Sequence, residues 1–266
     1  MKIAFCISGL FKPSSSYSTA YQNKFAYLTE KIKAYNADTF IFSFSKEIES
    51  EVVDIFKPKS FGFRAQEEFS DKISNINSIL DKGAAKRVFS FFYSRKRVCE
   101  LRKEFEEANN IKYDAVVLCR PDFKEIGEVA ASAGHMEAQN FQIPNLNRVD
   151  PNYLYSVYWN QLNAGMADWF FISNPKNADF VSDIYDRLPV YLQKNSEYQK
   201  SLAAGFPYSN SENRFSQEIF QENSQHSERI DEIHMLNQHC LLKHYLLENG
   251  KFSLDFLKFT NDSNLH

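Results

Sequence analysis

The chain has 266 residues, enough to bury a sizeable core in one large α/β domain or two small ones. Its hydrophobic residues amount to 43% and include 25 phenylalanines, so we expect a folded, aromatic-rich protein and not a disordered one. The formal net charge of −3 gives no reason to expect nucleic acid or an anionic membrane surface as a partner.

The amino terminus and the cysteines favour a cytoplasmic protein. Residues 1–8 become polar too soon for a secretory signal, and no apolar run approaches the roughly 20 residues that span a bilayer. The cysteines are widely scattered, which favours buried free thiols over disulfides or a metal site. They are Cys6, Cys99, Cys119 and Cys240.

The first third of the chain alternates short apolar runs with amphipathic segments. Strands are predicted over residues 3–8, 39–44 and 61–64, with helices over 21–35 and 47–56 between them. This βαβαβ order indicates parallel strands joined by right-handed crossovers.

The first predicted strand ends in Ser8 and Gly9, and the proline and serines of residues 10–18 indicate a loop. A strand, a glycine turn, a loop and a helix are how nucleotide-binding α/β units begin. The glycine spacing of the phosphate-binding loops is missing here, so this pattern alone is weak.

Two helices are predicted next, over residues 69–80, ending at Gly83, and over residues 85–109. Arg95 falls on the inward face of the long helix among cationic neighbours, so we predict that it binds a phosphate. Arg102 falls on the same face, and we expect its side chain to extend to the rim. That face is marked by apolar residues seven positions apart: Phe91, Val98 and Phe105.

The most informative strand covers residues 115–118. Its four consecutive apolar residues predict a central strand of a parallel sheet, buried on both faces. Pro121 cannot donate to a strand ladder, which leaves Arg120 and Asp122 at the carboxyl end, where ligands bind in open α/β sheets. A cation and a carboxylate there suit a phosphate-bearing ligand, with Mn²⁺ or Mg²⁺ bound by Asp122. The alternative is a structural ion pair.

The next segment is less regular until a strand at residues 167–173. Residues 141–144 indicate a short strand, and residues 145–159 an irregular, tyrosine-rich segment. Asp168 opens the strand after a turn of small residues at 163–167. Its carboxylate could act as a general base, orient a sugar hydroxyl, or cap the turn.

The last third is predicted to be mostly helical. Asn174 and Pro175 are typical of a helix start, and that helix continues to residue 192. A polar loop over residues 194–213 precedes two helices, at 214–223 and at 234–249. His234, His239 and His244 are spaced by five, about 140° apart on a helix, so they cannot share a metal and are interpreted as surface or packing residues.

Five short motifs then occur in order: KIAFCISG at residues 2–9, DTFIFS at 38–43, YSRK at 93–96, YDAVVLCRPD at 113–122 and DWFFIS at 168–173. Together they resemble small bacterial glycosyltransferase-like proteins with a GT-A-type fold, linked to lipopolysaccharide and capsule synthesis. The resemblance covers about residues 1–192. It implies one α/β domain over residues 1–266, with a mainly parallel, doubly wound, Rossmann-related sheet and a helical C-terminal extension over residues 193–266.

The activity implied by the resemblance is transfer of a sugar from a nucleoside diphosphate to a glycan or lipid-linked acceptor. The enzyme would be cytoplasmic, or peripheral at the inner membrane. Two alternatives stay open: a non-catalytic nucleotide- or sugar-binding protein on the same fold, and a nucleotidyltransferase. The sequence specifies neither the donor sugar, the acceptor, the linkage nor the oligomeric state.

The resemblance also implies roles for individual residues. Asp122 would contribute to catalysis as the ligand of Mn²⁺ or Mg²⁺. The family motif is D-x-D, however, and Arg120 replaces its first carboxylate, so Arg120 could itself neutralise the diphosphate. Asp168 would be the acceptor-side base or contact the donor sugar. The residues implied to contact the nucleotide and its phosphates are Ser8, Gly9, Ser94, Arg95, Lys96 and Arg120.

Overall fold

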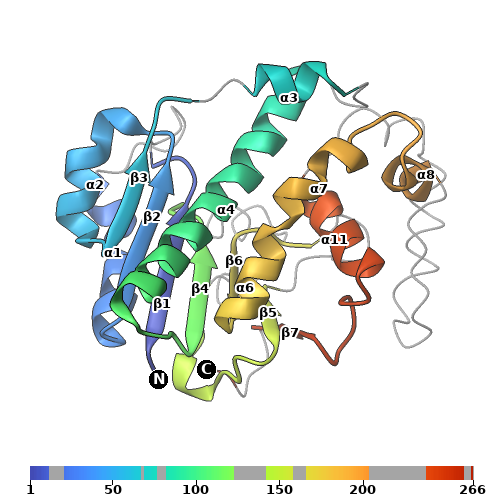
Figure 1. Ribbon diagram of the computed structural model, residues 1–266. Helices are drawn as coiled ribbons and strands as arrows, with labels where there is room; N and C mark the ends of the chain where they lie inside the picture. The colour runs from blue at the N-terminus through green and yellow to red at the C-terminus, as the bar shows by residue number, and fades with distance from the viewer. Residues whose placement is uncertain are drawn as a thin grey trace.

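The computed structural model describes residues 1–11, 21–66, 69–76, 82–122, 142–157, 166–203, 238–260 and 265. These residues form one seven-stranded sheet with helices packed on it (Figure 1). The strand order is β3-β2-β1-β4-β6-β5-β7.

The first half of the chain builds the parallel side of the sheet. Its strands are β1 (Ile3–Ser8), β2 (Asp38–Ser43), β3 (Ser60–Phe63) and β4 (Ala115–Cys119). The chain moves outward from β1 to β2 and β3, and then returns to place β4 on the other side of β1. The carboxyl ends of β1 and β4 therefore lie at a topological switch point, where ligands bind in open α/β sheets.

The second half adds an antiparallel strand beside β4. β6 (Phe170–Ser173) pairs with β4 so that Cys119 lies opposite Phe170. Because the two strands run in opposite directions, β6 begins at the edge of the sheet where β4 ends. β5 (Leu154–Ser156) pairs antiparallel with β6 and parallel with β7 (Leu257–Phe259). The predicted mainly parallel sheet is thus a mixed sheet in which most pairs are parallel.

Buried apolar side chains alternate between the two faces of the sheet. Ala4 and Cys6 belong to one apolar cluster, and Ile3, Phe5 and Ile7 belong to the other. The second cluster is covered by α1 (Tyr21–Ala34) and α2 (Glu49–Phe56). The first is covered by α4 (Lys82–Asn109), α6 (Pro175–Ser182), α7 (Ile184–Tyr191) and α11 (Gln238–Glu248), as Figure 1 shows.

Several predictions from the sequence are confirmed. Residues 3–8 and 115–118 are neighbouring central strands, and every residue of both is buried. Asn174 caps α6, because its side-chain oxygen accepts a hydrogen bond from the backbone N–H of Asn177 at 2.9 Å. All four cysteines are buried and free. None of the helices that the structure describes is long and apolar enough to cross a membrane.

Other predictions are wrong at the level of local structure. Gly83 lies inside α4, whereas α3 (Ser70–Ser74) ends well before it. Residues 142–144 form no strand, and β5 lies in the segment expected to be irregular. The C-terminal part contributes β7 to the sheet and is therefore not only helical. A strand of three residues is too short to show a periodic pattern, and pairing with neighbours decides its existence.

Two helices also differ from the prediction. Residues 197–203 form α8 (Glu197–Ala203) within the expected loop, and the expected helix to residue 192 is divided into α6 and α7 at Asp183. The predicted helix at 214–223 lies outside the described residues, as do the serines of the expected loop at 12–18 and residues 163–165 of the small-residue turn.

Arg102 does not extend to the rim of the core. Its side chain is 1% exposed and forms ion pairs with Glu106 of the same helix and with Asp179 of α6. Two carboxylates therefore offset the cost of burying this charge. The ion pair between Arg102 and Asp179 connects α4 to α6. The sequence alone does not show that α6 brings Asp179 close to Arg102.

Candidate functional site

The ends of β1 and β4 touch at Gly9. This glycine has a φ of +129°, which strains residues with a side chain, and a Cβ atom there would lie 3.5 Å from Cδ of Pro121. Its N–H donates to the carbonyl oxygen of Phe42 at 3.3 Å, and its own carbonyl accepts from Oγ of Ser43 at 2.7 Å. Ser8, just before it, is buried. The contact with Pro121 would be ordinary for a Cβ atom, so it is the backbone conformation that favours glycine at this turn.

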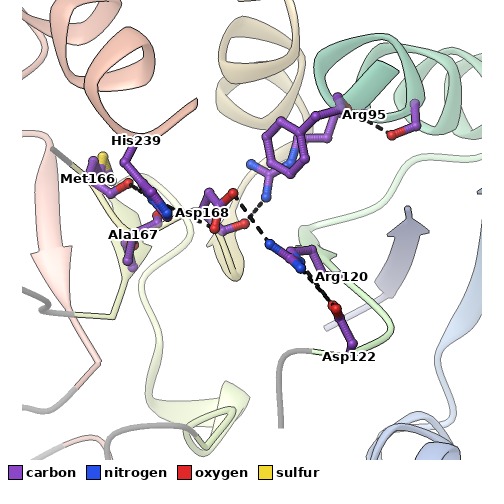
Figure 2. Close-up of polar contacts among 10 residues, drawn as sticks. Arg95, Arg120, Asp122, Met166, Ala167, Asp168 and His239 are labelled. Carbon is purple, nitrogen blue, oxygen red and sulfur yellow. Dashed lines mark hydrogen bonds and ion pairs between the residues drawn. The ribbon is translucent and has the colours of Figure 1, made fainter. Parts of the chain in front are cut away.

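The pairing of β4 with β6 brings Asp168 to the carboxyl end of β4. The N–H of Arg120 donates to the carbonyl oxygen of Trp169 at 3.0 Å, which continues the pairing of β4 with β6 beyond the two strands. As a result, Nη1 of Arg120 lies 3.6 Å from Oδ2 of Asp168. Figure 2 shows Asp168 among side chains from several parts of the chain. We call this group the Asp168 cluster; its members are Arg95, Arg120, Asp122, Asp168 and His239.

The carboxylate of Asp168 is fully buried and close to cationic groups. Its exposed fraction is 0%, and its oxygens face the side chains of Gln238, Arg120 and His239. Burial alone would raise the pKa of this carboxyl group, but His239, Arg120 and Arg95 together lower the pKa below its ordinary value. A carboxylate with a lowered pKa is a weak base near neutral pH. These surroundings favour a role in holding cations over the acceptor-side base role.

Arg95 lies behind Asp168 and is 1% exposed, so the prediction that it faces inward is confirmed. Its Nη2 donates to the backbone carbonyl of Asp168. Its guanidinium carbon lies 4.4 Å from the ring centroid of Phe91 and 5.0 Å from that of Phe171. Nε and Nη1 have no hydrogen-bond partner among the described residues. Burial lowers the pKa of Arg95 to about 10, which leaves it charged at neutral pH.

Arg120 also forms an ion pair with Asp122, whose carboxylate is more exposed than that of Asp168. Its Nε and Nη2 donate to the two oxygens of Asp122, each at 2.9 Å, in a bidentate ion pair. The side chains of Arg120 and Asp122 are 23% and 25% exposed. Burial would lower the pKa of Arg120, but Asp122 and Asp168 raise it above its ordinary value. All three guanidinium nitrogens face carboxylates, so an incoming phosphate must compete with Asp122, the more exposed of the two.

The metal ligand predicted from the sequence is already engaged by another side chain. Asp122 is the residue predicted to bind the metal, and both of its oxygens already accept hydrogen bonds from Arg120. Among the described residues, no group of three or more His, Cys, Asp or Glu side chains could hold a metal ion.

Ser94 and Lys96, two of the residues predicted to contact phosphate, have other partners. Oγ of Ser94 donates to the carbonyl oxygen of Phe91 at 2.8 Å, and the residue is buried. Lys96 forms an ion pair with Asp186 of α7. Successive helical residues point about 100° apart, so Arg95 faces the sheet while its neighbours face elsewhere.

His239 is the member of the cluster that the sequence does not reveal. Its Nδ1 lies 2.8 Å from the carbonyl oxygen of Met166 and 3.7 Å from Oδ1 of Asp168. Its backbone carbonyl accepts a hydrogen bond from the N–H of Met166 at 3.0 Å. These hydrogen bonds connect the first turn of α11 to Met166, which precedes β6. No spacing in the sequence connects α11 with Asp168, so the sequence predicts only a surface or packing role for His239.

No protein-family model, curated protein or solved structure matches this chain. The chemistry of the cluster is therefore the basis for assigning a function. Two guanidinium groups, one imidazole and one ionised buried carboxylate could bind an anion and move a proton.

We expect Asp168→Asn to destabilise the protein by about 3 kcal/mol at neutral pH, because Arg95 and Arg120 lose a buried counter-charge. The control is Asp122→Asn, which should cost at most about 1 kcal/mol because its ion pair is partly exposed. Urea denaturation of the wild type and both variants measures the difference. Equal losses for the two variants would contradict the central role of Asp168.

The pH dependence gives an independent check. A lowered pKa in the folded state means that ionised Asp168 contributes stability above about pH 4, the ordinary pKa of an unfolded aspartate. That contribution is lost as the pH falls through the lower pKa of the folded state. The stability difference between the wild type and Asp168→Asn should therefore narrow on acidification, and a constant difference would contradict the charge argument.

Proposed function

We propose that the protein is a glycosyltransferase that binds a nucleoside-diphosphate sugar at the carboxyl ends of β1 and β4. Two guanidinium groups, Arg95 from α4 and Arg120 from the end of β4, converge on Asp168 at this switch point. That convergence is the observation on which the proposal depends, because guanidinium groups pair bidentately with phosphate oxygens. The resemblance of the five motifs adds the sugar and the glycan or lipid-linked acceptor.

Arg120 is the group that would contact the diphosphate. Its side chain is 23% exposed, whereas Arg95 is 1% exposed and would add positive charge from behind. When the bond from the anomeric carbon to the phosphate oxygen breaks, negative charge grows on the leaving diphosphate. A fixed guanidinium in a partly buried site stabilises that charge without having to reorganise. Gly9 would let the nucleotide approach the backbone closely.

One observation favours a second candidate, a nucleotide- or sugar-binding protein without turnover. The carboxylate predicted as the acceptor-side base is fully buried and has a lowered pKa, so it is a weak base. On this alternative the cluster would bind the diphosphate and the sugar would stay attached.

The first test is donor turnover by the wild-type protein. A panel of UDP-glucose, UDP-galactose, UDP-N-acetylglucosamine and GDP-mannose is incubated with the protein, with water as the acceptor. We expect release of the free nucleoside diphosphate from at least one donor. Thermal stabilisation by a donor without release would support the non-catalytic candidate. Release of pyrophosphate from a nucleoside triphosphate and a sugar phosphate would support a nucleotidyltransferase.

Arg120→Ala should weaken UDP binding at least about tenfold, because one charge-assisted phosphate contact contributes about 1.5–3 kcal/mol. Lys96→Ala is the matched control: it removes the cation that follows Arg95 on α4, and the ion pair of Lys96 is with Asp186 of α7. Its effect should stay within about twofold, which is less than 0.5 kcal/mol in binding free energy. Isothermal titration calorimetry measures both constants. Equal weakening would mean that only overall charge matters.

Asp122→Asn distinguishes a metal ligand from a competitor for Arg120. If Asp122 occupies Arg120 until a phosphate arrives, the variant should bind UDP up to about fivefold more tightly, since a partly exposed ion pair is worth up to about 1 kcal/mol. The gain should be the same with Mn²⁺ and with EDTA. Weaker binding that appears only with Mn²⁺ would instead support the metal role predicted from the sequence.

A further inference from the structure

Two buried serines hold the turn that follows β1 against the end of β2. We call residues 9–11 the β1 turn. Oγ of Ser43 donates to the carbonyl oxygen of Gly9 at 2.7 Å and accepts a hydrogen bond from the backbone N–H of Ser45 at 3.0 Å. Oγ of Ser45 in turn accepts from the backbone N–H of Phe11 at 3.2 Å. Ser43 and Ser45 are 0% and 1% exposed, so these hydrogen bonds lie in a low-dielectric interior that strengthens them.

Apolar packing fixes the far end of the β1 turn. The side chain of Phe11 is fully buried, and its ring centroid lies 5.5 Å from that of Phe25 and 6.0 Å from that of Phe56. At the near end, Gly9 is held to β2 through both its N–H and its carbonyl oxygen. The residue between these two anchors, Leu10, therefore has a defined backbone position.

Leu10 is the exposed member of the β1 turn. Its exposed fraction is 55%, although the residues on both sides of it are anchored. A single exposed leucine is common on protein surfaces and would mean little by itself. The place of Leu10 beside the proposed diphosphate site is what gives it meaning.

The β1 turn lies against the residue that follows Arg120. A Cβ atom on Gly9 would lie 3.5 Å from Cδ of Pro121, so Leu10 and Arg120 are each one residue away from this contact. Consecutive Cα atoms are about 3.8 Å apart, which lets Leu10 and Arg120 contact one ligand of nucleotide size. A nucleoside diphosphate has an anionic end that suits a guanidinium and a flat base that suits an apolar side chain.

We infer that Leu10 contacts the nucleobase of the donor, and that Ser43 and Ser45 are positioning residues that hold it there. This inference rests on the proposed function and deepens it, because it assigns the nucleoside half of the ligand to the β1 turn. The base packs its face on the leucine side chain, and the diphosphate extends from there to Arg120. Since the turn is held before the ligand arrives, binding costs little conformational freedom.

The test compares ligands with and without a base, on the full-length chain. UDP, GDP and inorganic pyrophosphate are titrated into each protein by isothermal titration calorimetry. Leu10→Ala should weaken nucleotide binding at least about fivefold, because three carbon atoms lose their apolar contact, and should leave the Kd for pyrophosphate within about twofold. Leu10→Phe keeps an apolar contact and should bind the nucleotide as tightly as the wild type. The matched control is Leu254→Ala, which removes a leucine that is 60% exposed and lies between α11 and β7, and it should change neither constant.

Ser45→Ala supplies the readout for the positioning residues. Without Oγ of Ser45, the N–H of Phe11 loses its partner, so Leu10 is held less firmly and the nucleotide should bind at least about threefold more weakly. Pyrophosphate should bind as it does to the wild type. A merely structural role would lower the unfolding temperature without separating the two ligands.

Arg120→Ala gives the opposite pattern, because it should weaken the binding of nucleotide and pyrophosphate alike. The inference is overturned, and the proposed function stands, if the wild type binds UDP or GDP and Leu10→Ala leaves that Kd unchanged. The same holds if Leu10→Ala weakens pyrophosphate binding as much as nucleotide binding. If the wild type binds neither nucleotide and no donor, both fail together.

Discussion

The burial of one carboxylate, that of Asp168, is the constraint on which this edge of the molecule depends. An ionised group with no exposed surface must be compensated by nearby charged or polar groups, and three separate elements supply them. Arg95 comes from α4, Arg120 from the end of β4 and His239 from the start of α11. Arg120 and His239 lie beside the carboxylate, and Arg95 donates to the backbone carbonyl of the same residue.

The direction of β6 allows Asp168 and Arg120 to lie close together. If β6 ran parallel to β4, its first residues would lie at the opposite edge of the sheet, and Asp168 would be far from Arg120. The antiparallel register of Cys119 with Phe170 places both at the carboxyl end of β4. The mixed character of the sheet therefore concentrates polar groups at the switch point, where a wholly parallel sheet would need them from loops alone.

The sequence predicts those features that leave a local pattern. The apolar runs of β1 and β4 identify central strands, and the spacing of seven on α4 identifies Arg95 as inward-facing. It does not predict features that depend on distant partners. The three-residue strands β5 and β7 exist because of their neighbours, and Arg102 is buried because α6 supplies Asp179. For the same reason His239 could not be recognised as a neighbour of Asp168.

The position of α11 and β7 late in the chain has a consequence for fragments and for synthesis on the ribosome. A piece ending at Leu192 would contain every residue to which the five motifs give a role. It would nevertheless lack His239 and the strand that pairs with β5. Asp168 would then lose the imidazole that lies 3.7 Å from its Oδ1. The cluster can therefore be complete only after residues 238–260 have been synthesised and have packed, which couples assembly of the site to a segment far along the chain.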